Sequence, residues 1–189
     1  MTMEQLHPSV DELDDEGEED LQESAPVLAW PPLRRVQYLD IRSSEQEREY
    51  EARQSIRQRT LAMRPVAGEH VTRKARSVRS MRAVMTLLRD RDDTLLALRS
   101  EDFYDTDSAR ADMRHLISIA KSLRIVLVED EQEKRVSWWL IAPRIGVVLL
   151  GPRSYASQGK DLALRDAARA KRLLSRLKVG SQDLNCDGE

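Results

Sequence analysis

Hydrophobic residues recur every three to four positions in three segments of the chain, and this spacing predicts amphipathic helices. The helices are expected over about residues 73–90, 107–122 and 161–177. Each helix would turn an apolar stripe toward a shared core. The three stripes consist of Val78, Met81, Val84, Met85 and Leu88; of Ala109, Met113, Leu116, Ile117 and Ala120; and of Ala163, Ala167, Ala170, Leu174 and Leu177.

Shorter runs of apolar, β-branched or aromatic residues predict four strands. The strands are expected at residues 94–98, 124–128, 135–141 and 145–150. The last three are joined by connections too short for a parallel crossover, so they should form an antiparallel meander. Because side chains alternate along a strand, the adjacent Trp138 and Trp139 must face opposite sides of the sheet.

Residues 27–39 hold seven apolar side chains around the pair Pro31-Pro32, which a helix does not readily cross. The segment has two interpretations: an extended strap packed on the folded body, or a linear motif that docks on a partner. Linkers rarely carry Trp and Tyr together, which favours docking. The candidate partner contacts are Trp30, Leu33 and Tyr38.

A further helix is expected over residues 44–64, with Ser43 or Ser44 as its N-cap. Glu47 stands three positions after Ser44, which is the spacing of a capping box. This helix has few apolar residues, so it should be solvated and form only against a partner.

These elements predict an α+β protein. Its parts are an acidic disordered tail at 1–26, the strap or docking motif with the charged helix at 27–69, an α+β domain at 70–178 and a C-terminal tail at 179–189. Within the domain, the order helix, short strand, helix, β-meander, C-terminal helix is typical of a small winged-helix-like fold. The helix at 107–122 would then enter the major groove of DNA.

The net charge of −2 conceals two opposed regions. Residues 1–23 contain ten acids and no base, which leaves 31 basic and 23 acidic residues, or +8, for residues 24–189. Such a body is a candidate binder of polyanions, and the acidic tail could compete for the same surface.

Arginine carries this positive charge, with 25 of the 31 basic residues, and suits bidentate contacts to phosphate. Each of the three domain helices gathers basic side chains on one side. The alternatives are solvated helix faces and the codon bias of a GC-rich genome. The candidate nucleic-acid contacts are Arg73, Arg76, Arg79 and Arg82; Arg110, Arg114 and Lys121; and Arg165, Arg169, Arg172 and Arg176.

The hairpin loop at residues 129–133 weighs against a DNA-binding wing. It holds four acids, whereas a wing that meets phosphates usually carries Lys or Arg. If residues 124–141 form a wing, it should point away from nucleic acid or toward a basic protein.

Signals for catalysis are poor. His7, His70 and His115 are scattered, and neither a metal-binding pattern nor a cysteine cluster accompanies them, since Cys186 is the single cysteine. The glycines of segment 151–160 lack phosphate-loop spacing. We therefore expect no enzyme activity, no cofactor and no metal.

Pro143 and Arg144 interrupt the longest apolar stretch, Trp138 to Leu150, so it should not span a membrane. The first residues do not resemble a signal peptide, which predicts a soluble, intracellular protein.

The sequence therefore predicts a non-enzymatic nucleic-acid-binding or regulatory protein that is modulated by its acidic tail. The choice between DNA and RNA and the oligomeric state stay open. The alternative is an adaptor or assembly component that docks through residues 27–64.

Overall fold

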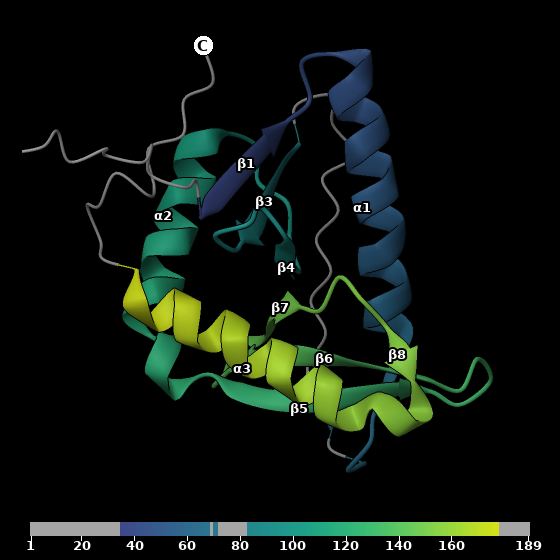
Figure 1. Ribbon diagram of the computed structural model, residues 1–189. Coiled ribbons are helices and arrows are strands. Elements are labelled where there is room, and N and C mark those ends of the chain that lie inside the picture. The colour runs from purple at the N-terminus through teal and green to yellow at the C-terminus, as the bar shows by residue number, and fades with distance from the viewer. Residues whose placement is uncertain (1–34, 69, 72–82, 178–189) are drawn as a thin grey trace, which may run out of the picture.

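The computed structural model describes residues 35–68, 70–71 and 83–177, which form one antiparallel sheet with helices on both of its faces (Figure 1). The strand order is β1-β3-β4-β7-β6-β5-β2, and β8 pairs with β6. The elements are β1 (Val36–Asp40), α1 (Ser44–Ala62), β2 (Arg64–Pro65), β3 (Val84–Arg89), β4 (Leu95–Arg99), α2 (Thr106–Ser118), β5 (Arg124–Asp130), β6 (Arg135–Ala142), β7 (Gly146–Leu150), β8 (Tyr155–Ala156) and α3 (Lys160–Arg176), with 3-10 turns at Ala120–Ser122 and Ser157–Gly159.

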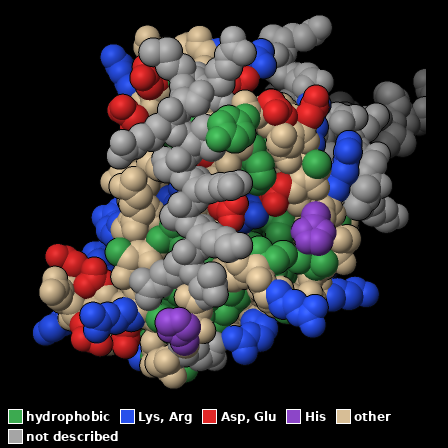
Figure 2. Space-filling model, turned by 180° about the vertical axis from the view of Figure 1, so that it is seen from behind, with side chains coloured by type: hydrophobic (Ala, Val, Ile, Leu, Met, Phe, Trp, Pro, Cys, Tyr) green, Lys and Arg blue, Asp and Glu red, His purple; other side chains and the backbone are tan. Residues whose placement is uncertain are grey.

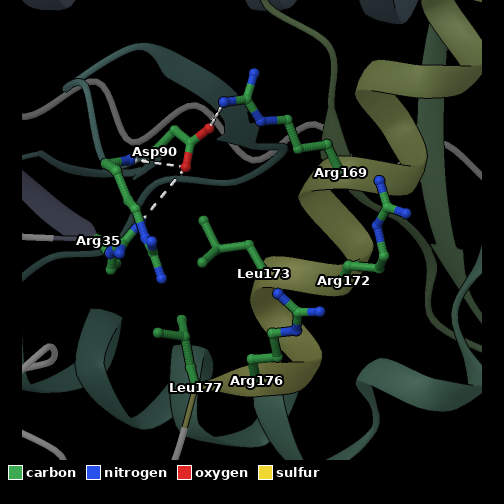
Figure 3. Close-up of a pocket in the computed structure, with 8 residues that line it drawn as sticks. Arg35, Asp90, Arg169, Arg172, Leu173, Arg176 and Leu177 are labelled. Atoms are coloured by element: carbon green, nitrogen blue, oxygen red, sulfur yellow. Dashed lines mark hydrogen bonds and ion pairs between the residues drawn. The ribbon is translucent and has the colours of Figure 1, made fainter.

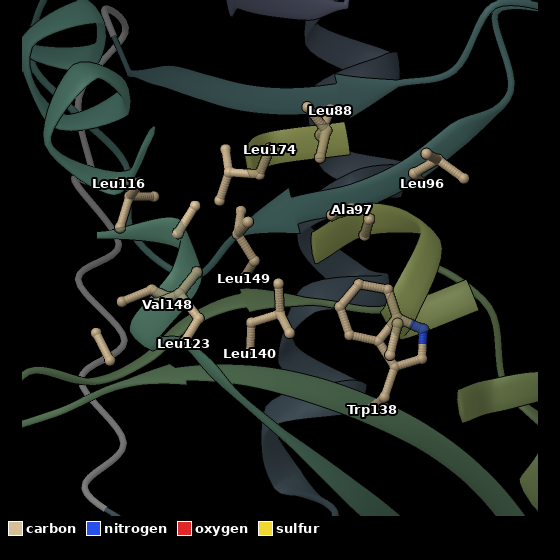
Figure 4. Packing of buried hydrophobic residues seen from close by; sticks show 14 of the residues in the cluster. Leu88, Leu96, Ala97, Leu116, Leu123, Trp138, Leu140, Val148, Leu149 and Leu174 are labelled. Carbon is tan, nitrogen blue, oxygen red and sulfur yellow. The ribbon is translucent and has the colours of Figure 1, made fainter. Parts of the chain in front are cut away.

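The sheet separates two hydrophobic clusters. Trp138 and Leu140 of β6 point to the face that α2 and α3 cover (Figure 4), whereas Trp139 and Ile141 point to the face of α1. Both tryptophans are at most 1% exposed, which confirms that they lie on opposite sides. On the side away from α3, hydrophobic side chains are visible between charged residues at the margins (Figure 2).

The meander and two of the predicted helices are confirmed, so the α+β class holds. β5, β6 and β7 pair antiparallel in the expected order. The predicted apolar stripes of α2 and α3 lie in the cluster of Trp138, except for Ala109, which is buried outside it. The N-cap of α2 is Asp105, whose Oδ1 accepts a hydrogen bond from the Ser108 backbone N–H at 2.6 Å, and the helix begins at Thr106, one residue before the predicted start.

The first predicted domain helix is wrong where the structure describes it. Residues 84–89 form strand β3, which lies between β1 and β4. Positions 84–88 are buried on both faces of the sheet and are apolar except for Thr86, and such a run does not distinguish a strand from a buried helix. The order from β3 onward is strand, strand, helix, hairpin, and lacks the leading helix of the winged-helix prediction over 84–89.

The segment before the domain contributes to the same sheet. β1 pairs with β3, and Val36 and Leu39 are buried, so residues 36–40 follow the strap interpretation. Helix α1 begins after Ser43, whose Oγ accepts from the Gln46 backbone N–H at 3.3 Å. Ser43, one of the two predicted caps, is therefore the N-cap, and the predicted capping-box pair of Ser44 and Glu47 is replaced by Ser43 and Gln46.

Candidate anion-binding site

A cavity of about 470 Å³ lies where the start of β1, the β3–β4 turn and the C-terminal half of α3 meet (Figure 3). Arginines from all three segments surround it, and we refer to it as the arginine pocket. Its lining consists of Arg35, Asp90, Arg91, Arg169, Arg172, Leu173, Arg176 and Leu177.

Small residues on α3 set the position of its arginines. Ala163, Ala167 and Ala170 are fully buried, so the helix packs closely on the sheet through one narrow stripe. Positions 165, 169, 172 and 176 follow each other at four- and three-residue spacing, which keeps them on one exposed side of the helix. The predicted basic stripe of α3 therefore exists, and three of its four arginines reach the pocket.

Asp90 is the one acidic residue of the pocket lining. Its Oδ1 lies 3.4 Å from Arg35 Nη1 and accepts a hydrogen bond from the Arg91 backbone N–H at 2.7 Å. The Arg169 guanidinium contacts Oδ2 (Figure 3). The side chain of Asp90 is only 12% exposed, so this carboxylate fixes Arg35 and Arg169 from within the wall.

Arg91, Arg172 and Arg176 are exposed, and none of them pairs with an acidic side chain of the described residues. Five arginines and one aspartate give the lining a formal charge of +4 (5 minus 1). The pocket offers an anion many N–H donors, while its one carboxylate is already paired. Its chemistry is therefore that of binding an anion and holding it in place, because arginine forks match phosphate and carboxylate oxygens.

Helix α2 carries its basic residues elsewhere. The Arg110 guanidinium lies over the Tyr38 ring, 5.9 Å from its centre, and pairs with Asp107 at 3.5 Å. Its side chain is only 18% exposed. Arg114 and Lys121 are exposed but do not line the arginine pocket. Of the three basic residues predicted to face a DNA groove from α2, Arg114 and Lys121 are exposed, whereas Arg110 is largely covered.

Tyr38, a candidate partner contact, belongs to the sheet: it lies in β1 and is half-buried. Trp30 and Leu33, and the candidates Arg73, Arg76, Arg79 and Arg82, lie outside the described residues.

Arg35, Asp90 and Arg91 were not predicted as site residues from the sequence. They reach the pocket because β1 and β3 are paired, and the Arg89 backbone N–H donates to the Arg35 carbonyl at 2.8 Å. The sequence does show that these three residues are charged and lie beside predicted apolar segments. It does not show which of those segments are neighbours in the sheet.

Other polar residues noted in the sequence have structural roles. Asp105 caps α2, and Asp102 is buried against Arg57 of α1. Segment 151–160 forms β8 and a 3-10 turn before α3. Over the described residues, no cluster of three or more His, Cys, Asp or Glu side chains has the arrangement of a metal site. No helix in that part of the chain is long and apolar enough to cross a membrane.

Comparison of the chain with protein-family models, with curated proteins and with solved structures gives no match.

Proposed function

We propose that the protein binds nucleic acid without catalysing a reaction, and that the arginine pocket and the exposed stripe of α3 make the contact. The observation that supports this proposal is that arginines of three separate segments line the same cavity. They lie directly before β1, in the β3–β4 turn and in α3, far apart in the sequence, and the lining has a formal charge of +4. Such a concentration of like charge is unfavourable unless an anion compensates it.

The length of the stripe favours a chain of phosphates over a single small anion. Arg165 and Arg176 are separated by 11 residues of helix, or about 16 Å at 1.5 Å per residue. Arg165 lies outside the pocket lining but continues the same stripe. A nucleic-acid backbone can meet the pocket and the outer arginine together, because it carries a phosphate at every nucleotide.

This proposal places the contact on α3 rather than on α2. A winged-helix mode would need the basic side of α2 to face the groove, yet Arg110 is engaged with Tyr38 and Asp107. The adaptor alternative now depends on Trp30, Leu33 and the exposed side of α1, since Tyr38 is part of the sheet.

The acidic N-terminal residues give the interaction a built-in competitor. Glu23, the last of the ten acids, precedes Arg35 of the pocket by 12 residues, which an extended chain spans in about 40 Å at most. The acids are therefore tethered near the arginines they would neutralise, and their competition should weaken nucleic-acid binding in a salt-dependent manner.

The test is a charge reversal on α3. We expect the double variant Arg172→Glu, Arg176→Glu to lose at least about tenfold in affinity for single-stranded RNA or duplex DNA at low salt, and to show a smaller salt slope. The matched control is Arg48→Glu, Arg59→Glu, which makes the same change in net charge on exposed positions of α1.

Both variants should unfold at the temperature of the unchanged protein, because all four side chains are exposed. If the two variants lost affinity equally, only net charge would matter and the α3 site would be rejected. If the unchanged protein bound neither nucleic acid at low salt, the proposed function itself would fail.

A further inference from the structure

We infer that the arginine pocket takes a phosphate monoester, a dianionic terminal phosphate, and so recognises the phosphorylated end of a nucleic-acid strand or a free mononucleotide. This inference rests on the proposed function and names the chemical group that enters the pocket.

The first argument is the geometry of the donors of the cavity, which come from separate segments: Arg35 beside β1, Arg91 in the β3–β4 turn and three arginines of α3. The side chains of Leu173 and Leu177 point to the side where Arg35 lies (Figure 3). Arg169, Arg172 and Arg176 belong to the α3 stripe and lie along the helix, whereas Arg35 and Arg91 lie off that line. Donors that surround one volume suit a group which ends there and presents oxygens in several directions.

The second argument is charge. A phosphate monoester carries about −1.5 to −2 charges at neutral pH and three terminal oxygens. An internal phosphodiester carries one negative charge. Asp90 already occupies one side of the pocket and holds Arg35 and Arg169. The remaining arginines, Arg91, Arg172 and Arg176, supply three charges, which match a dianion more closely than a monoanion.

The third argument is size and lining. A cavity of about 470 Å³ lies within the range of roughly 300–1,000 Å³ that small-molecule sites occupy. Leu173 and Leu177 provide an apolar patch against which a sugar could rest. The lining contains no aromatic ring, and so no stacking platform for a base. The pocket should therefore discriminate phosphorylation state and show little preference among bases.

The experiment compares matched 20-nucleotide single-stranded RNAs of mixed sequence that end in a 5′-phosphate, a 3′-phosphate or hydroxyls only, each labelled internally. We expect the full-length protein to bind at least one phosphorylated RNA about tenfold or more tightly than the hydroxyl form, as charge-assisted hydrogen bonds to a dianion allow. The variant Arg172→Glu, Arg176→Glu should abolish the difference. Asp90→Asn, which raises the formal charge of the lining to +5, should increase affinity for the phosphorylated RNA.

Competition separates the possible sources of the phosphate. Adenosine monophosphate should displace the phosphorylated RNA and adenosine should not. If all three RNAs bound equally and the α3 variant still lost binding, the inference would be overturned and the proposed function kept. If no RNA bound but adenosine monophosphate did, the monoester pocket would stand with a free nucleotide as its ligand, and the proposed function would fail. A phosphoserine peptide that bound more tightly than the phosphorylated RNA would overturn the nucleic-acid source.

Discussion

A single buried carboxylate links two distant parts of the fold. Asp102, in the loop after β4, accepts from Arg57 Nη1 at 2.5 Å and from the Tyr50 hydroxyl at 2.7 Å. The side chains of Asp102 and Arg57 are 0% and 2% exposed. In the sequence, Asp102 is one of the acids in the loop between β4 and α2, and nothing there indicates a partner 45 residues away. Such pairs follow from the tertiary fold and are not predictable from local pattern.

Replacing Asp102 by Asn should leave the Arg57 charge buried without compensation, which typically costs about 3–5 kcal/mol. Urea unfolding would measure the loss. Asp107→Asn is the control, since the side chain of Asp107 is 92% exposed and its pair with Arg110 is on the surface. We expect the control to change stability by less than about 1 kcal/mol. Equal effects of the two variants would show that the buried pair does not stabilise the fold.

The same cluster predicts a response to alkaline pH. Burial, and then the Asp102 carboxylate, raise the pKa of the Tyr50 phenol from 10.0 to about 12. Between those pH values the unfolded chain releases this proton and the folded chain retains it, so the stability from Tyr50 is complete below pH 10 and is lost as pH rises toward 12. Tyr155, beside Asp166, has its pKa raised in the same direction and to about the same value.

In Tyr50→Phe, part of that alkaline loss should disappear, because the titrating group is gone. Unfolding free energies measured from pH 9 to 12 would give a shallower decline than in the unchanged protein. An identical decline in both would contradict the raised pKa of Tyr50.

Among the secondary-structure elements, periodicity predicted α2 and α3, because each buries one side and exposes the other. β4, β6 and β7 are buried on both faces and were predicted as short apolar runs bounded by turns. β3 is buried on both faces, and its pairing with β1 depends on residues about 50 positions earlier. Helix α1 has little apolar surface, and the buried Arg57 ties it to Asp102.

The close packing of α3 gives a prediction about the pocket. Ala167→Leu inserts three carbon atoms at a position that is 0% exposed, so it should cost about 1–3 kcal/mol and displace the helix from the sheet. Because Arg35 and Arg169 must then separate, anion affinity should fall several-fold. Leu164→Ala, at a position that is 41% exposed, is the control and should alter neither property appreciably. If the Ala167→Leu protein were destabilised but bound the anion as before, the site would not depend on the close packing of α3.

Across the whole molecule, the sequence shows which segments are acidic and which are basic. It does not show which charged residues lie close together in the fold. The arginine stripe of α3 was predictable from spacing alone. Its union with Arg35 and Arg91 required the β1–β3 pairing, and the place of Asp90 between them required the turn after β3. The α3 part of the candidate site was thus predictable from local pattern, whereas the part formed by Arg35, Asp90 and Arg91 depends on the topology of the sheet.

Deleting residues 1–26 should strengthen nucleic-acid binding, because it removes ten acids tethered to a body of charge +8. The gain should be largest at low salt and should shrink as the ionic strength approaches 1 M, where the Debye length is about 3 Å. Titrations of both proteins across a salt series measure it. If the full-length and truncated proteins bound nucleic acid equally at low salt, the acidic residues would not compete for the arginines.

Locating the bound strand is the most direct test of the proposal that nucleic acid contacts the arginine pocket and α3. Full-length protein would be photocrosslinked to 4-thiouridine-substituted single-stranded RNA, digested beside glutamate residues, which α3 lacks, and mapped by mass spectrometry. We expect crosslinks within residues 90–91 and 165–177, and we expect the Arg172→Glu, Arg176→Glu variant to lose them. Crosslinks confined to α1, to the 131–134 hairpin loop or to residues 72–82 would contradict the proposal.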